Sequence, residues 1–450
     1  MKPVAAALLF LLGLPAAAAP SRFLDLYKTG RVVIEPDPSF GKSVDWGSFF
    51  FDDSQDMAVA PDGSIFVANT IENCILKFDA AGRLVKKFGQ KGQGPGDFIS
   101  PMDLSILDGR FLVSNEYATN RRISLFNLDG TFHKLLKTRF SPSFVTALKD
   151  NKIAYQSWVS VAPGTETTQM TYLVLILDAV SGTEKEIARW TTAMDSIRVG
   201  QGSVSSGERT RGGFLIARSA QGDLLVGNTI IPRLDEYSPE GQKMRSLDLN
   251  LTPIPVTKQY IRDYHRRMVQ GMKSEPNYEK IPQYRDVVAK VESASIDHIF
   301  GEYLPLYKEI LVDSEGNILV FKKSECLENC PNIFQVYSPE GKYVCEVELA
   351  SEDFNVSIDY RFKRICFTSE GIFCLFPLKG DELQTPRLVR VDVAGAPSRR
   401  SCICQDDPEA AVFSAPFHGL QDFDRLHFSP GGALHRLRDI AGGAVAVGRG

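Results

Sequence analysis

A glycine-rich stretch, FGQKGQGPGDFISP from Phe88 to Pro101, is the part of this 450-residue chain that most suggests phosphate chemistry. Its four glycines lie beside lysines, a combination that resembles a phosphate-binding loop. A Walker-type loop, however, continues from its last glycine into Lys and then Ser or Thr, whereas Gly96 is followed by Asp97 and Phe98. A dinucleotide-binding loop opens a helix, but here another strand pattern follows. The stretch is therefore predicted to connect two structural units.

Metal and acid–base chemistry has few candidate residues in this sequence. Asp56 and Asp103 lie at the start of two predicted inner strands and are candidate Ca²⁺ ligands, because hard cations prefer clustered oxygen atoms. The structural alternative is that both carboxylates cap loops or accept hydrogen bonds from backbone N–H groups. The six histidines avoid the starts of the predicted inner strands, and no H-E-x-x-H, G-x-S-x-G or EF-hand motif occurs. No cofactor is expected apart from Ca²⁺ at the two aspartates.

Polar side chains in equivalent loops of the first two sequence units are candidates for contacts with a partner. They offer amide, carboxylate, phenol and guanidinium groups, which suit hydrogen bonding to a protein, peptide or glycan. The alternative is ordinary solvated surface. The candidates are Asn69, Glu72, Asn115, Glu116, Tyr117, Arg121 and Arg122.

The eight cysteines are concentrated late in the chain, with Cys74 alone upstream. Cys326 and Cys330 flank the short segment Leu-Glu-Asn. They are the candidate pair for a local disulfide bond, which an exported protein can keep oxidised.

The N-terminal segment MKPVAAALLFLLGLPAAAAPS has the layout of a signal peptide, with Lys2, an apolar run and small residues suited to cleavage near Ala19. We assign residues 1–19 to this signal, with an uncleaved anchor as the alternative. No later segment reaches the ~18 apolar residues of a spanning helix. The mature chain is therefore predicted to be periplasmic or extracellular, without an integral membrane segment. Its formal net charge of −4 and lack of a basic stripe argue against a nucleic-acid partner.

Turn signals divide the rest of the chain into repeating units. Residues 57–89 contain four short apolar runs, two of which are joined by Asp62-Gly63. Asp-Gly between alternating runs is a strong hairpin signal because glycine accepts positive φ. The arrangement recurs in units that start at Met102, Val145, Phe214, Glu309 and Arg364. Six units of four antiparallel strands predict an all-β, six-bladed β-propeller, with an elongated sandwich as the alternative.

Three segments fall outside this repeat. Gly30–Asp37 lacks a partner and is predicted to supply a strand to the last blade, which closes the ring. An insertion at about residues 251–308 separates units four and five and is predicted to form a helix capped by Thr257. One face of that helix is predicted to pack on the disc through Tyr260, Tyr264 and Met268. The propeller is assigned to residues 20–395, and residues 396–450 to an atypical tail expected to be poorly ordered.

Strand order separates the two faces of the predicted disc. Turns between strands one and two, and between three and four, are short Asp-Gly or Glu-Gly turns on one face. The opposite face, called the long-loop face below, carries the loops between strands two and three and the crossovers between blades. Because loops on a rigid scaffold commonly carry binding sites, the long-loop face is predicted to bind a partner. Its long segments are residues 88–101, 157–171, 191–213, 251–308 and 322–332.

The first unit resembles a known repeat. PDGSIFVANTIENCILKFDAAGRLVKKFGQKGQGPGDFISPMDL is similar to the NHL repeat, with its dG-iyVaD strand, its N-rI-fd-G segment and its glycine-rich end before Phe and Pro. Asn69 stands where that repeat usually has aspartate, and Cys74 where it often has arginine. The whole chain resembles the exported bacterial six-bladed β-propeller or NHL-repeat proteins. This resemblance implies a fold rather than an activity.

Two functions are compatible with these observations. The first is an exported, non-catalytic scaffold that binds a protein, peptide or glycan through the long-loop face. The alternative is a divalent-metal-dependent lyase or hydrolase, similar to propeller lactonases or amidating lyases, with its site at the central channel. The scarcity of acid–base residues favours the first.

Overall fold

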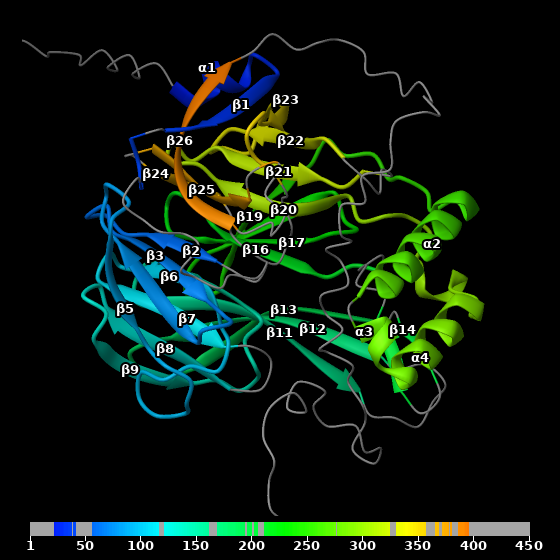
Figure 1. Cartoon of the computed structure of the whole chain (residues 1–450). Helices are drawn as coiled ribbons and strands as arrows, with labels where there is room; N and C mark the ends of the chain where they lie inside the picture. The colour runs from blue at the N-terminus through cyan, green and yellow to red at the C-terminus, as the bar shows by residue number, and fades with distance from the viewer. Residues whose placement is uncertain are drawn as a thin grey trace, which may run out of the picture.

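Four sheets of four antiparallel strands, together with one eight-stranded sheet that comprises two further blades, make up a six-bladed propeller. Figure 1 shows how these elements are arranged. The computed structural model describes residues 22–37, 39–41, 56–116, 121–161, 169–193, 196–199, 202–205, 211–275, 277–324, 330–356, 365–368, 371–377, 379 and 386–395. The predicted six-bladed β-propeller is confirmed, and the elongated sandwich is wrong. The assigned signal peptide and C-terminal tail lie outside the described residues.

The first three blades follow the chain in order. Blade one consists of β2 (Met57–Val59), β3 (Ile65–Asn69), β4 (Cys74–Phe78) and β5 (Leu84–Phe88). Blade two consists of β6 (Pro101–Leu107), β7 (Phe111–Glu116), β8 (Arg122–Asn127) and β9 (Phe132–Lys137). Blade three consists of β10 (Phe144–Ala147), β11 (Lys152–Val161), β12 (Gln169–Asp178) and β13 (Glu184–Ala193). A hairpin of β14 (Ser196–Val199) and β15 (Gly202–Ser205) follows.

The remaining blades enclose the helices. Blade four consists of β16 (Phe214–Arg218), β17 (Leu224–Asn228), β18 (Arg233–Tyr237) and β19 (Lys243–Asp248). Helices α2 (Lys258–Ser274), α3 (Asn277–Lys280), α4 (Pro282–Ser293) and η2 (Asp297–Ile299) come next. Blade five consists of β20 (Tyr307–Val312), β21 (Ile318–Lys322), β22 (Asn332–Tyr337) and β23 (Tyr343–Ala350). Blade six consists of β24 (Ile365–Thr368), β25 (Gly371–Pro377), β26 (Pro386–Gly395) and the early strand β1 (Arg31–Pro36).

The apolar core lies between blades. Every residue of β3 is buried, because the middle strands of a blade are covered by a neighbouring sheet on both sides. The outermost strand β5 is exposed over four of its five residues. One core cluster joins Leu107 and Val113 of blade two to Val145 and Tyr155 of blade three. Each such buried aliphatic side chain contributes roughly 1.5–3 kcal/mol, so the seams hold the ring together.

β1 closes the ring, as its unpartnered pattern predicted. It pairs antiparallel with β26, from Val32 opposite Gly395 to Pro36 opposite Val391. It also pairs parallel with β23 over residues 31–33, so blades five and six form one eight-stranded sheet. The N-terminal strand therefore joins two blades.

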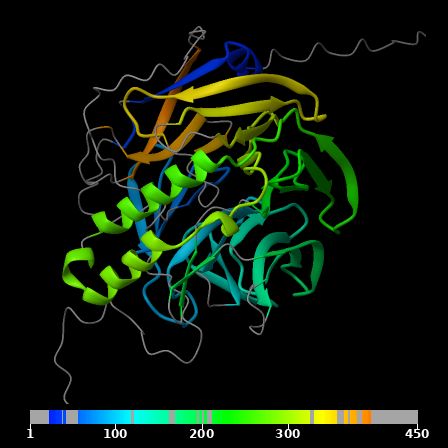
Figure 2. The ribbon, with the colours of Figure 1, turned by 90° about the vertical axis from the view of Figure 1, so that its right-hand side faces the viewer.

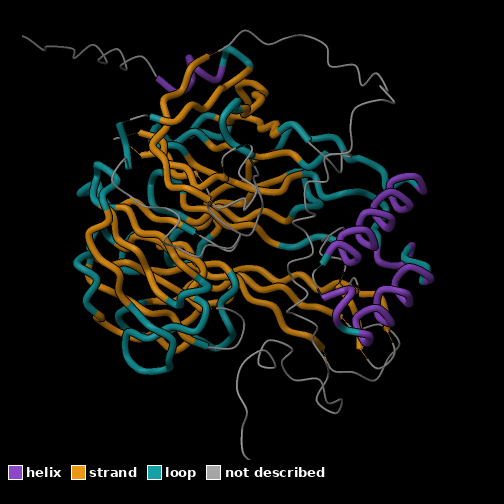
Figure 3. The backbone as a smooth tube through the Cα atoms, in the orientation of Figure 1, coloured by secondary structure: helices purple, strands orange, loops and turns teal. Residues whose placement is uncertain are grey.

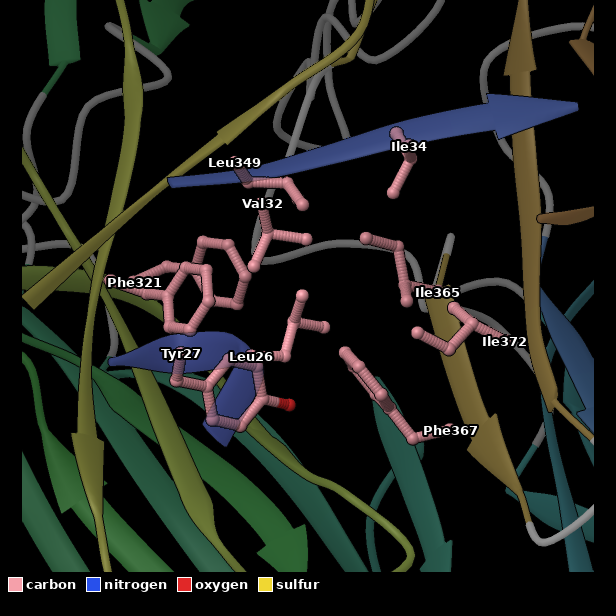
Figure 4. Close-up of a pocket in the computed structure, with 10 residues that line it drawn as sticks. Leu26, Tyr27, Val32, Ile34, Phe321, Leu349, Ile365, Phe367 and Ile372 are labelled. Atoms are coloured by element: carbon pink, nitrogen blue, oxygen red, sulfur yellow. The ribbon is translucent and has the colours of Figure 1, made fainter. Parts of the chain in front are cut away.

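Helix α1 (Arg22–Tyr27) covers the seam between blades five and six. The hydroxyl of Tyr27 donates to Oδ2 of Asp313 at 3.1 Å, and the Glu315 carboxylate accepts the backbone N–H of Phe23 at 3.2 Å. Figure 4 shows Leu26 and Tyr27 pointing into an apolar cavity of about 10 Å³, about the space of one water molecule. Residues of α1 and β1 thus form the final layer over this seam.

Lowering the pH is expected to weaken the closure near Asp37. Hydrogen bonds from Ser39, and then the Arg390 guanidinium, lower the pKa of Asp37 from 3.8 to about 2. Because the folded-state pKa lies below the unfolded one, this stabilisation is present above about pH 4 and lost as the pH falls towards about 2. Asp37→Asn should therefore lower the free energy of unfolding at neutral pH, and its difference from wild type should shrink in acid. Urea unfolding at several pH values tests this, with Asp25→Asn as the exposed control; a difference independent of pH contradicts it.

Four successive seams share one polar contact. At each, a Lys or Arg on the outermost strand of one blade donates to a backbone carbonyl in the turn between strands three and four of the next. The contacts are Lys86 to Asp129 at 2.9 Å, Lys134 to Ala179 at 2.8 Å, Lys185 to Glu240 at 2.7 Å and Arg245 to Pro339 at 2.6 Å. Glycine in these turns allows the close approach: Gly341 has φ +86°, and a Cβ there would lie 2.5 Å from Leu247 of the preceding blade.

The helical insertion stands on the long-loop face, between β19 and β20 (Figures 1 and 2). Thr257 caps α2 as predicted, and its side chain accepts the N–H of Tyr260. The aromatic stripe does not pack on the disc: Tyr260, Tyr264 and Met268 are buried in a cluster formed by the insertion itself. The insertion has enough apolar residues for a core of its own, which its amphipathic pattern could not reveal. Figure 3 shows the long strands of blade three extending towards it.

Candidate functional site

The two candidate metal ligands lie at the inner seam between blades one and two. Asp56 is fully buried; its Oδ1 accepts the N–H of Met57 and its Oδ2 that of Leu104, both at 2.8 Å. Oδ2 of Asp103 accepts from Nδ2 of Asn115, also at 2.8 Å. Across the described ranges, no three His, Cys, Asp or Glu side chains are grouped so as to hold a metal ion. Both carboxylates therefore have hydrogen-bonding roles in the fold, and the Ca²⁺ hypothesis stays a prediction.

Most of the predicted contact residues of blades one and two are engaged within the protein. Asn69 is buried, and its Oδ1 accepts the N–H of Glu72 at 3.1 Å. The Glu72 carboxylate forms an ion pair with Lys87. Asn115 is buried as well, and its Oδ1 accepts the N–H of Asp103 at 2.8 Å.

A buried ion pair links the glycine-rich stretch to blade two. Glu116 is 1% exposed and receives Nε of Arg122 at 3.0 Å. Arg122 also donates Nη1 to the carbonyl of Gln93 at 2.9 Å and Nη2 to that of Asp97 at 3.3 Å. The arginine thus fixes the crossover between the first two blades.

The structure does not test the roles predicted for Arg121, Tyr117 and Cys326. Arg121 is exposed, and its carbonyl accepts the N–H of Thr138 at 3.0 Å. Tyr117 lies outside the described residues, as does Cys326, the predicted disulfide partner of Cys330. The contact roles of Arg121 and Tyr117 and the disulfide stay predictions.

The predicted connector, Phe88–Pro101, fills the seam between blades one and two. Phe98 is fully buried, with its ring centroid 5.3 Å from that of Phe126. Gly89 adopts φ +84°, and a Cβ there would lie 2.4 Å from the Phe98 ring. The glycines therefore let the chain turn tightly over an inserted phenylalanine.

The seam between blades three and four instead contains a groove of about 270 Å³. One wall comes from the outermost strand of blade three and the other from the first three strands of blade four. It combines aromatic, aliphatic, amide and charged groups, the mixture typical of small-ligand sites. Its lining residues are Ile187, Ala188, Arg189, Trp190, Phe214, Val226, Asn228, Ile231, Arg233, Asp235 and Tyr237.

A displaced β-bulge shapes the blade-three wall. Between Glu186, opposite Leu175, and Ala188, opposite Val174, the residue Ile187 is inserted without a partner. In blades one, two, four and five, the corresponding irregularity adjoins the turn, at the last pair before it. Successive residues of a regular strand point to opposite faces, yet Ile187 and Ala188 both line the groove. The bulge in the middle of β13 accounts for this, because an extra residue re-aims its neighbours.

Trp190 is held in place from within the protein. Its Nε1–H donates to the carbonyl of Arg211 at 3.0 Å, and its side chain is half-buried against an apolar cluster that includes Phe214 and Val226. An indole on an outermost strand, where side chains are commonly exposed, contributes a fixed apolar surface to the groove.

The charged groups of the groove are paired. Oδ1 of Asp235 receives Nε of Arg233 at 3.1 Å, Nζ of Lys243 at 2.9 Å and the Ser246 hydroxyl at 2.8 Å. Arg189 makes two contacts of 2.8 Å with Glu186. These two side chains lie on the other face of β13, because they are opposite Leu173 and Leu175, which pack against blade two. Burial, and then the Asp235 carboxylate, raise the pKa of Tyr237, so its phenol, which is protonated at neutral pH in any case, remains a donor in more alkaline solution as well.

Sequence reasoning missed this groove. The usable signal was Trp190 within EKEIARWTTA, a large aromatic residue on a predicted outermost strand. No local sequence pattern indicates the bulge at Ile187. None indicates which neighbouring blade completes the site.

Fold and site together define a six-bladed β-propeller with a groove at one blade seam. Residues 57–186 match the protein family described as DUF5128, 6-bladed beta-propeller, which confirms the resemblance at the level of this fold. No curated protein matches the chain. Within the described ranges, no helix has the length and apolarity needed to cross a lipid bilayer.

Several solved structures resemble the chain at low identity. A member of the DUF4221 family from Bacteroides vulgatus is 11% identical, with a TM-score of 0.47 over 82% of this chain and 100% of that one. A Bacteroides fragilis protein inferred to be exported is 11% identical, with a TM-score of 0.45 over 81% and 95% of the two chains. A gluconolactonase of Xanthomonas campestris is 10% identical, with a TM-score of 0.38 over 76% and 88%. Because all three TM-scores are below 0.5, we infer no function from these structures.

Proposed function

We propose that this chain is an exported, non-catalytic β-propeller that binds its ligand in the groove between blades three and four. The observation that carries the proposal is the groove itself: about 270 Å³, with a fixed indole and several charged groups. The seam between blades one and two is filled by Phe98, so an open seam is not a necessary result of this repeat.

Two features support binding rather than catalysis. Among the lining residues that the structure describes, the one carboxylate, Asp235, is engaged by Arg233, Lys243 and Ser246. A general base instead needs a carboxylate or imidazole directed at substrate, and the described part of the lining contains no histidine or cysteine. The signal-like N-terminus supports a periplasmic or extracellular location.

Trp190→Ala should weaken ligand binding at least tenfold, because it removes the largest apolar surface of the groove. Peptide and oligosaccharide libraries screened against the purified mature chain would provide the ligand, and titration calorimetry the affinities. Met244→Ala, an exposed change on the outermost strand of blade four, is the matched control. A lactone-hydrolysing or lyase activity lost in Asp56→Ala or Asp103→Ala, together with a bound divalent ion, would overturn the proposal in favour of the enzyme.

A further inference from the structure

The groove combines an apolar wall with a rim on which positive and negative side chains form ion pairs. Arg233 and Lys243 face Asp235, which leaves a surplus of one positive charge among these three groups. A strongly anionic ligand would gain little here, because each cation already has a carboxylate partner. A purely apolar ligand would bury these polar groups without replacing their hydration.

The same charged groups can still form hydrogen bonds with the hydroxyl groups of a ligand. A guanidinium has five N–H donors, and the ion pair of Arg233 with Asp235 uses only part of them. Tyr237 adds a protonated phenol, and Asn228 lies at the buried end of the lining. Donors and acceptors are therefore close together, which suits a ligand that carries several hydroxyl groups.

The apolar wall suits a ring. The indole N–H of Trp190 is used by Arg211, so this side chain contributes apolar surface rather than a donor. Phe214 and Ile231 extend this surface. The volume of about 270 Å³ is near the low end of small-ligand sites, roughly 300–1,000 Å³, which limits the occupant to about one ring.

We infer that the groove recognises an uncharged, hydroxyl-rich ring, as presented by one sugar unit of a neutral glycan. This inference rests on the proposed function and narrows its ligand class. The apolar face of such a ring would pack on Trp190, and its hydroxyls would bond to Arg233 and Tyr237. Longer glycans would extend from the groove past the exposed edge of blade three.

An array of neutral and uronate-containing oligosaccharides, probed with the mature chain, tests the inference. We expect binding to neutral glycans, with affinities by calorimetry reduced at least tenfold in Trp190→Ala and about fivefold in Arg233→Gln. Tyr343→Ala changes an exposed aromatic residue on the outermost strand of blade five and should leave the affinity within twofold. Arg233 is exposed, so its variant retains the fold and keeps the test valid if Trp190→Ala is unstable.

Other outcomes separate this inference from the proposed function. The inference is overturned if the chain binds only uronate-containing oligosaccharides. It is also overturned if neither Trp190→Ala nor Arg233→Gln changes the affinity for neutral glycans. A peptide whose binding is lost in the groove variants, with no glycan bound, refutes the sugar assignment and preserves the groove as a binding site. If no library ligand is sensitive to the groove variants, both proposals fail.

Discussion

Ile34→Asp is expected to prevent stable closure of the propeller. Ile34 is 1% exposed in β1 and packs in the core cluster shared by blades five and six. A carboxylate there would be buried without a partner, at a cost of several kcal/mol, against a total stability of about 5–15 kcal/mol for a typical domain. Because β1 pairs with both β23 and β26, the damage reaches two blades at once. Thermal unfolding and limited proteolysis would show a large loss of Tm or no cooperative transition.

Glu35→Ala provides the matched control, because the neighbouring side chain of the same strand is exposed. Its effect should stay within about 0.5 kcal/mol, as for most surface changes. If Ile34→Asp unfolded at a Tm close to that of wild type, β1 would not be the closing strand in solution.

Arg122→Met should destabilise the chain by about 3–5 kcal/mol. The change leaves the Glu116 carboxylate buried without its arginine, and removing one member of a buried ion pair has this order of cost. It also removes the donors to Gln93 and Asp97, so the crossover over Phe98 should become sensitive to proteases. Chemical denaturation gives the first quantity, and the rate of cleavage within residues 88–101 gives the second.

The double variant Glu116→Gln/Arg122→Met makes this test specific. Replacing both charges removes the uncompensated carboxylate, so the double variant should be more stable than Arg122→Met alone. Additive losses would instead show that Glu116 and Arg122 do not act as a pair. Lys87→Met, which affects a more exposed pair with Glu72, should cost about 1 kcal/mol or less.

Local patterns in the sequence were sufficient for the architecture. Asp-Gly and Glu-Gly turns, such as those at Gly63 and Gly341, require positive φ, and only a few residue types satisfy this requirement. Strand alternation between such turns is equally local, so the blade count and the closing role of β1 could be predicted. The glycine-rich stretch was likewise recognised as a connector because the residues after Gly96 exclude a phosphate loop.

The burial of polar residues could not be predicted in the same way. Asn69, Asn115 and Glu116 look like loop residues in the sequence, yet each is buried at a blade end. The partners of Asn115 and Glu116 lie in another strand, as with Glu116 and Arg122, whereas the partner of Asn69 lies in the loop that follows it. The prediction that α2 packs on the disc was wrong for a related reason, since an amphipathic pattern shows that a helix has a partner but not which one.

The sequence by itself determined the six blades, the faces on which loops of each length lie and the strand that closes the ring, because each depends on turn chemistry and strand alternation within a few residues. Only the tertiary structure decided where a ligand could fit. The groove needs a bulge at Ile187, an indole oriented by Arg211 and the facing side chains of blade four. These features come together through packing between blades, and packing depends on residues far apart in the chain.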